Sequence, residues 1–127
     1  GPGIRIQITD PGNRVSAELL LDAVEELRDA GAEVIELNDS VRLVMHSHFA
    51  TDDVGGVSAD GVSLGAPYVI DAIGDPATLE AGARFWGGLV SEIEGERVGG
   101  RVTIEQLQTV EITTTVEVRE PQFARPR

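Results

Sequence analysis

The sequence predicts an α+β domain in which a mostly antiparallel sheet carries two helices on one face. Apolar residues alternate with polar ones in the first strand-like segment and again near the end of the chain. Between them, two segments carry apolar residues at helical spacing or begin with strong helix-start residues. The connections are short and rich in Gly, Asn and Asp, which favours tight turns. A length of 127 residues fits one domain with its own core.

The first predicted strand lies in the opening residues of the chain. Ile4, Ile6 and Ile8 alternate with polar residues, which is the period of a half-buried strand. Asp10-Pro11-Gly12 follows and has the composition of a turn.

A helix is predicted over the segment that begins after Ser16, which is a suitable N-cap. Leu20, Val24 and Leu27 recur at helical spacing and define the buried face. Gly31 is the expected left-handed stop. Acidic residues fill the outer face of this helix: Glu18, Asp22, Glu25 and Glu26.

The next segments predict strands separated by turns. Residues 34–37 form a strand, residues 38–40 (Asn-Asp-Ser) a turn, and residues 41–49 a second strand. Asp60-Gly61 between two valines predicts the tip of a tight hairpin.

The stretch PYVIDAIGDPATLEA, residues 67–81, predicts an apolar strand that turns directly into a helix. Asp75 stands where an N-cap belongs, and Pro76 at the first helical position. A functional alternative would place a bound anion at this helix start. Asp75 puts a negative charge there, so we favour a structural turn. The helix is expected to break near residues 86–88, before one or two further helical turns.

Residues 101–118 predict one long or two short closing strands, because β-branched residues dominate. We expect a single domain over residues 1–120 and a flexible C-terminal tail over residues 121–127. The resulting element order most resembles the ferredoxin-like (split βαβ) sandwich, with a mostly antiparallel sheet and two helices on one face.

Composition excludes several classes of function. The net charge is -12, which disfavours nucleic acids and anionic membrane surfaces as partners. No cysteine is present, so disulfides and thiolate chemistry are excluded. No run of 18 apolar residues occurs within these residues. Phosphate-binding loops and the G-x-S-x-G nucleophile motif are also absent from the sequence.

The remaining candidates for chemistry are weak. His46 and His48 would share one face of a strand and could start a zinc or copper site, but no third ligand stands at a defined spacing. Asp52, Asp53 and Asp60 lie near glycines without the spacing of a calcium loop, which favours a solvated loop. We therefore assign no catalytic, cofactor-binding or metal-binding residue and expect no cofactor.

One aromatic pair has two interpretations. Phe85-Trp86, followed by two glycines, could anchor a partner protein at an exposed surface. We favour the alternative, in which the pair packs under the sheet.

Three stretches together resemble a known bacterial family. They are GPGI at residues 1–4, ELRDAGAEVIELND at residues 26–39 and PYVIDAIGDPATLE at residues 67–80. Their order and spacing are similar to the family called domain of unknown function 881, which includes YlxW-like proteins. The stretch MHSHFATDDVGG departs from the family, which commonly has a more basic or neutral segment there. The resemblance implies that the opening Gly-Pro-Gly is native.

The resemblance implies a domain outside the plasma membrane of a single-pass bacterial protein, with the membrane segment upstream of Gly1. It carries over no catalytic residue. All ten basic residues are Arg, which fits an actinobacterial source. We expect a non-enzymatic interaction domain that binds an envelope or division protein, or a second copy of itself, through a sheet edge such as residues 108–118. The alternatives are a small-ligand sensor and an unrecognised hydrolase.

Overall fold

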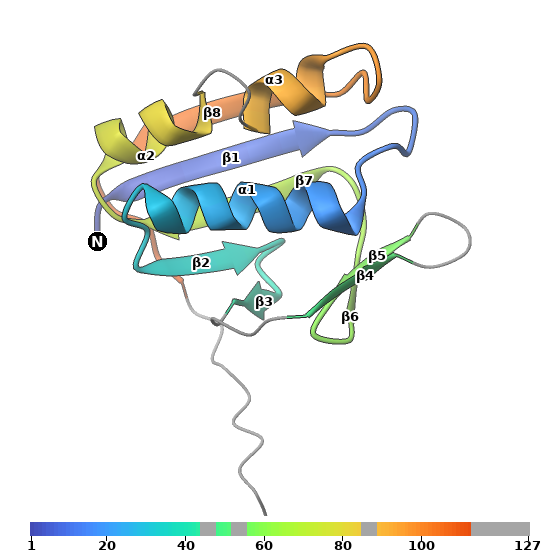
Figure 1. Ribbon diagram of the computed structural model, residues 1–127. Helices are drawn as coiled ribbons and strands as arrows, with labels where there is room; N and C mark the ends of the chain where they lie inside the picture. The colour runs from blue at the N-terminus through green and yellow to red at the C-terminus, as the bar shows by residue number, and fades with distance from the viewer. Residues whose placement is uncertain (44–47, 52–55, 85–88, 113–127) are drawn as a thin grey trace, which may run out of the picture.

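The structure is a computed structural model that describes residues 1–43, 48–51, 56–84 and 89–112 (Figure 1). It confirms a mixed α+β domain with mostly antiparallel strands. In chain order the elements are β1 (Gly3–Thr9), α1 (Ala17–Asp29), β2 (Val34–Leu37), β3 (Val41–Arg42), β4 (Phe49–Thr51), β5 (Val57–Ala59), β6 (Val62–Leu64), β7 (Tyr68–Ile73), α2 (Pro76–Ala83), α3 (Leu89–Glu94) and β8 (Arg101–Leu107).

The main sheet has five strands in the order β3-β2-β7-β1-β8, and every neighbouring pair is antiparallel. β1 and β2 run in the same direction, because both are antiparallel to β7, which lies between them. β7 and β8 are likewise separated by β1. A smaller sheet, in the order β4-β5-β6, extends from one end of the main sheet.

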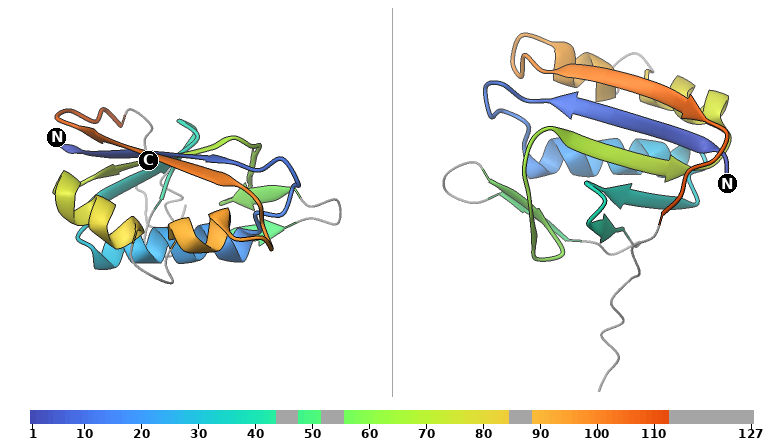
Figure 2. Two further views of the ribbon diagram at one scale, coloured as in Figure 1. Left: turned by 90° about the horizontal axis from the view of Figure 1, so that it is seen from above. Right: turned by 180° about the vertical axis from the view of Figure 1, so that it is seen from behind.

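The helices all lie on one face of the main sheet (Figure 2). The prediction of two helices on one face misses a third, because the short turns expected after residue 88 form α3. Ile93 of α3 is fully buried, so the helix completes the cover over β1 and β8. Burying one such side chain contributes about 1.5–3 kcal/mol.

The core lies between this helical layer and the sheet. The alternation predicted for β1 is confirmed, since Ile4, Ile6 and Ile8 are fully buried. The predicted face of α1 is also confirmed, with Leu20, Val24 and Leu27 against the sheet. The helix-side residues of the other strands complete this layer: Ile35, Leu37, Tyr68, Ile70, Ala72 and Val102.

The ends of α1 follow the predicted signals. The Ser16 hydroxyl oxygen accepts a hydrogen bond from the Leu19 N–H at 3.1 Å. Gly31 adopts a left-handed φ of 101°, and the Ala32 N–H donates to the Leu27 carbonyl at 2.9 Å. These contacts satisfy backbone groups that a helix end leaves without intrahelical partners.

Two predictions of one long strand, over residues 41–49 and 101–118, are wrong. Residues 41–49 do not form one strand, because β3 ends at Arg42 and β4 begins only at Phe49. The closing strand β8 ends at Leu107, and residues 108–112 are not in a strand. There the chain turns past the N-terminus, where the Val110 N–H donates to the Gly1 carbonyl at 2.6 Å. Residues 113–127, including the predicted tail, lie outside the described residues.

The predicted hairpin tip is confirmed between β5 and β6. Asp60 and Gly61 both have positive φ, at 49° and 83°, and the register places Ala59 opposite Val62. A two-residue turn with positive φ at both positions matches the twist of antiparallel strands.

Candidate functional site

The Gly74-Asp75-Pro76 junction is a helix start. The Asp75 carboxylate accepts hydrogen bonds from the Thr78 hydroxyl and from the Thr78 N–H, the latter at 3.0 Å. These two bonds hold the pKa of Asp75 below its usual range. The carboxylate already occupies the position that a bound anion would need, which supports the structural interpretation.

The face of the main sheet opposite the helices carries a row of charged side chains. Strand register sets Arg42 opposite Glu36, Glu36 opposite Asp71, Asp71 opposite Arg5, and Arg5 opposite Glu105. Directly opposed residues on adjacent strands project from the same face. We call these five residues the charged row.

An ion pair lies at the centre of the charged row. Arg5 Nε is 2.8 Å from Asp71 Oδ1, and Arg5 Nη2 is 3.3 Å from Asp71 Oδ2. Asp71 is only 1% exposed, whereas the Arg5 side chain is 39% exposed. The hydrogen bond to Asp71 is the main cause that raises the pKa of Arg5. Bidentate geometry makes this a strong and directional contact.

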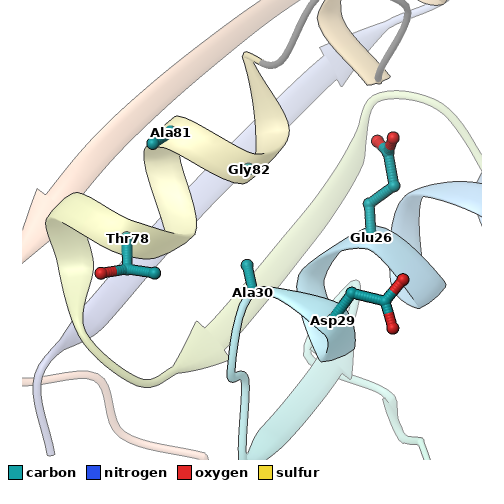
Figure 3. A pocket seen from close by; sticks show the side chains of 6 residues that line it. All are labelled: Glu26, Asp29, Ala30, Thr78, Ala81 and Gly82. Atoms are coloured by element: carbon teal, nitrogen blue, oxygen red, sulfur yellow. The ribbon is translucent and has the colours of Figure 1, made fainter.

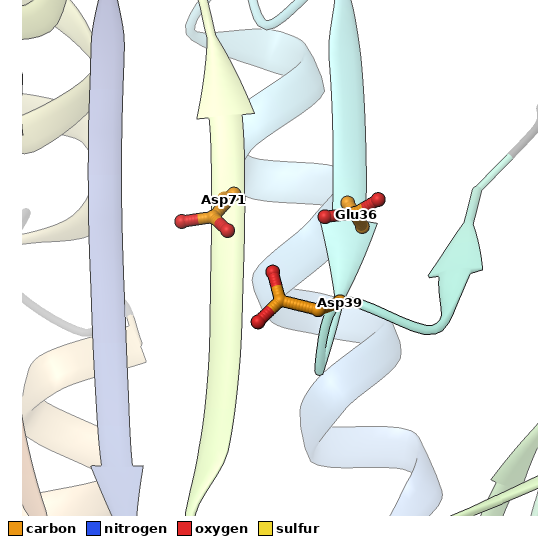
Figure 4. A group of neighbouring side chains, drawn as sticks. All are labelled: Glu36, Asp39 and Asp71. Atoms are coloured by element: carbon orange, nitrogen blue, oxygen red, sulfur yellow. The ribbon is translucent and has the colours of Figure 1, made fainter. Parts of the chain in front are cut away.

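An acidic cluster adjoins this pair (Figure 4). Glu36, Asp39 and Asp71 each offer a carboxylate oxygen, and these oxygens lie within 4.8 Å of one another. Hard cations such as Ca²⁺ prefer oxygen ligands of this kind. Here Asp71 already forms an ion pair with Arg5, and the register sets Arg42 against Glu36. We therefore interpret the three carboxylates as part of a charge network within the sheet rather than as a metal site.

Sequence reasoning missed this network. Its local signal was a single acid inside each of two apolar runs, VIEL at residues 34–37 and VIDAI at residues 69–73. That signal places Glu36 and Asp71 on the side of the sheet away from the core. Only the strand order brings the two acids together.

A groove lies between α1 and α2 (Figure 3). Its volume is about 520 Å³, and it is lined by Glu26, Asp29, Ala30, Thr78, Ala81 and Gly82. The small residues let the helices approach closely, since a Cβ added at Gly82 would lie 2.8 Å from the Ala30 Cβ. The carboxylates of Glu26 and Asp29 come from α1, so that side of the groove is acidic.

The two edges of the main sheet differ in length. β3 has two residues, whereas β8 has seven and pairs with β1 along its whole length. The Arg101 N–H points toward β1, where it donates to Thr9 Oγ1, and the Val102 N–H donates to Glu94 of α3. Because direction alternates along a strand, the N–H groups of Ile104 and Gln106 also point away from β1. No strand of the described residues pairs with this outer side.

Most of the residues singled out in the sequence lie outside the described part. This holds for His46, Asp52 and Asp53, so the structure does not test the metal alternative. It also holds for the aromatic pair at residues 85–86. His48 is exposed, and its N–H donates to Asp60 Oδ1 at 2.6 Å, which gives Asp60 a role in the small sheet.

Comparison with known proteins identifies the family. A family model described as "Bacterial protein of unknown function (DUF881)" matches residues 1–125. The chain belongs to the DUF881 family. The resemblance found in the three sequence stretches is thereby confirmed.

Relatives of this DUF881 domain match nearly its whole length. It is 40% identical over 129 residues to the UPF0749 protein Rv1825 of Mycobacterium tuberculosis, covering 99% of this chain and 43% of that protein. It is 24% identical to the UPF0749 protein YlxW of Bacillus subtilis, covering 94% of this chain and 54% of that protein. The DUF881 domain thus spans about half the length, or less, of these relatives.

A solved structure has the same fold as the DUF881 domain. It is the crystal structure of an uncharacterized conserved protein from Mycobacterium tuberculosis, with a TM-score of 0.89 and 38% sequence identity. The match covers 100% of this chain and 89% of the other. Among the described residues of this DUF881 domain, no helix is long and apolar enough to cross a membrane.

Proposed function

We propose that this DUF881 domain is a non-enzymatic interaction domain that binds a protein through the outer edge of β8. The observation that carries the proposal is a seven-residue strand paired on one side only among the described strands. The Val102 N–H at the start of this edge donates to Glu94 of α3. The outward groups of the later part, at Ile104 and Gln106, form a template on which another strand can add. The short opposite edge, β3, offers far less.

The partners of two described carboxylates, Asp71 in the sheet and Asp75 at the start of α2, support a structural rather than a catalytic role. Asp71 is held by Arg5, and Asp75 by Thr78. A catalytic acid or base must instead lie within hydrogen-bond reach of a substrate. Asp71 and Asp75 are instead hydrogen-bonded to other residues of the domain.

The cellular setting is also part of the proposal. We place the domain outside the plasma membrane of a single-pass protein and expect an envelope or division protein as its partner. The family resemblance supports this setting. The gene should encode an apolar segment of about 20 residues upstream of Gly1. Without such a segment the membrane part of the proposal falls, while binding through β8 is unaffected.

The fold is best interpreted as an elaborated ferredoxin-like (split βαβ) sandwich. The strand order β8-β1-β7-β2, with α1 linking β1 to β2 and α2–α3 linking β7 to β8, supports this. On this interpretation β3 and the small sheet are insertions between β2 and β7.

One matched pair of variants tests the interaction. Gln106→Ala and Gln106→Pro both remove the side-chain hydrogen bond to Glu80, but only proline removes the outward N–H. After crosslinking in the native cell and identification of partners, Gln106→Ala should keep its crosslinked partner and Gln106→Pro should lose it. Equal capture by both variants, with equal thermal stability, would contradict binding through this edge.

A small-ligand sensor is the second candidate, because the α1–α2 groove has a volume within the range of ligand sites. A thermal-shift screen with amino acids, nucleotides and divalent metals tests it. A stabilising ligand should lose its effect in Ala81→Phe, which narrows the groove, and keep it in Gln7→Ala on the sheet. No stabilisation by any compound counts against the sensor.

A further inference from the structure

The outer edge of β8 is complementary to itself. We propose that a second copy of this chain pairs with it, antiparallel, about a two-fold axis that passes between the two Thr103 residues. The inference rests on the proposed function, in which β8 is the binding edge, and names the partner. A two-fold axis lets both copies use the same surface, which closes the assembly at a dimer.

The backbone supplies the hydrogen bonds for this pairing. The N–H groups of Ile104 and Gln106 point away from β1, as the outward direction of the neighbouring Val102 N–H indicates. In the proposed register the Ile104 N–H meets the Val102 carbonyl of the partner subunit. The Gln106 N–H meets the Gly100 carbonyl of the partner subunit. By symmetry each bond forms twice. The N–H groups of Val102 and Gly100 face the same side and donate to the Glu94 side chain and to the Ile93 carbonyl, so the end of α3 must move aside for the pair to close.

The side chains select the register. With Thr103 opposite Thr103 of the partner subunit, Arg101 lies opposite Glu105 of the partner subunit on the face of the charged row. Both residues are exposed in the single chain. On the helix side, Val102 lies opposite Ile104 of the partner subunit, so two apolar side chains meet. Opposite charges and apolar pairs directly across two strands are both favourable.

Neighbouring registers lack this complementarity. An axis at Ile104 sets Arg101 opposite Leu107 of the partner subunit and Thr103 opposite Glu105 of the partner subunit. An axis at Glu105 sets two glutamates against each other, which is repulsive. Only the axis at Thr103 forms two Arg–Glu pairs.

The same register also continues the charged row. Glu105 already lies opposite Arg5 within its own chain. In the dimer it would lie between Arg5 and Arg101 of the partner subunit, so that a negative charge is flanked by two positive ones. The acidic excess of the chain, with a net charge of -12, opposes association of two copies in general. The self-pairing therefore depends on these local contacts.

Disulfide trapping tests the register, because the natural chain contains no cysteine. Opposed residues of a non-hydrogen-bonded antiparallel pair have Cα atoms about 4.5 Å apart, which a disulfide can bridge. Thr103→Cys should therefore give a covalent dimer on mild oxidation. Gln7→Cys is the matched control: Gln7 is exposed, lies opposite Thr103 on β1 and is one strand farther from the axis. It should remain monomeric.

Charge reversal tests the two Arg–Glu pairs. In the Thr103→Cys background, Arg101→Glu or Glu105→Arg alone should slow dimer formation by roughly tenfold, because each sets like charges opposite one another twice. The two reversals together should restore it. Circular dichroism of the reduced variants checks that all are folded.

Three outcomes would overturn the self-pairing. They are equal crosslinking of the Thr103→Cys and Gln7→Cys variants, preferential trapping of Ile104→Cys, and failure of the double reversal to restore trapping. The proposed function is judged separately by the Gln106 pair of variants. If Gln106→Pro loses a different captured protein while Thr103→Cys stays monomeric, the binding edge stands and the second copy is wrong.

Discussion

The two faces of the main sheet are stabilised by different interactions. The face under the helices is almost entirely apolar, with Ile6 at its centre fully buried. The opposite face carries the charged row, in which Glu36 and Asp71 are 2% and 1% exposed. Burial is thus nearly complete on both faces at these positions. Burial of an apolar side chain is non-directional, whereas burial of a carboxylate requires a partner at a defined place.

The two kinds of interaction fix the register of the strands in different ways. Sliding β1 by one residue against β7 would turn its isoleucines away from the helices. A slip of two residues keeps the isoleucines inside but separates Arg5 from Asp71, which are now directly opposed. The apolar face therefore selects which side of each strand is buried, and the charged row distinguishes among the registers that remain.

The largest effect is expected from breaking the apolar face. Ile6→Ala should lower the free energy of unfolding by about 3 kcal/mol, because it removes buried methylene groups and leaves a cavity. Gln7→Ala, the adjacent exposed residue of β1, should stay within about 0.5 kcal/mol of the natural chain. Urea unfolding followed by circular dichroism measures both. Similar values for the two variants would contradict the assignment of faces.

A smaller effect is expected from breaking the charged row. Arg5→Ala leaves the buried Asp71 carboxylate close to Glu36 and Asp39 without its guanidinium partner. We expect a loss of about 2 kcal/mol, below the value for a fully buried pair because Arg5 is partly exposed. Thermal and urea unfolding measure it.

A second variant separates charge from packing in this experiment. Adding Asp71→Asn to Arg5→Ala keeps the shape of the side chain and removes the unpaired charge. The double variant should regain about half of the loss, since a neutral buried group costs less than a charged one. If the double variant is less stable than Arg5→Ala, the repulsion among the three carboxylates is not the cause.

Much of the fold could be predicted because it depends on local signals. The alternation in β1, the apolar spacing of α1 and the caps at Ser16 and Asp75 are all found in the structure. The errors fall where tertiary contacts decide. The strand that begins at Val41 ends at Arg42, and Leu43 is buried outside a strand while its N–H donates to the Ile35 carbonyl.

The candidate sites were less predictable for the same reason. Of the edge predicted for binding, residues 108–112 are not in a strand, because β8 ends at Leu107, and residues 113–118 lie outside the described residues. The charged row depends on strand order, which brings Arg5, Asp71 and Glu36 side by side from three distant segments. The α1–α2 groove depends on Ala30 and Gly82, whose small size has no local signature of a site.

The smallest expected effect concerns Asp75, a charged group of the helical layer that the sequence did predict. Hydrogen bonds from Thr78 lower the pKa of Asp75 in the folded state. The stability that the ionised Asp75 contributes is therefore fully present above the pKa of an aspartate in the unfolded chain, about 4. It is lost as the pH falls through the lower pKa of Asp75 in the folded state. Asp75→Asn keeps a good N-cap and removes the titration. The fall in Tm between pH 5 and pH 2.5 should be smaller in Asp75→Asn than in Asp22→Asn, which removes the same charge from the exposed face of α1. An equal fall in Tm in the two variants would show that the charge of Asp75 does not contribute to the stability of the cap. The Arg5–Asp71 pair on the opposite face would then differ from it, because that pair depends on charge.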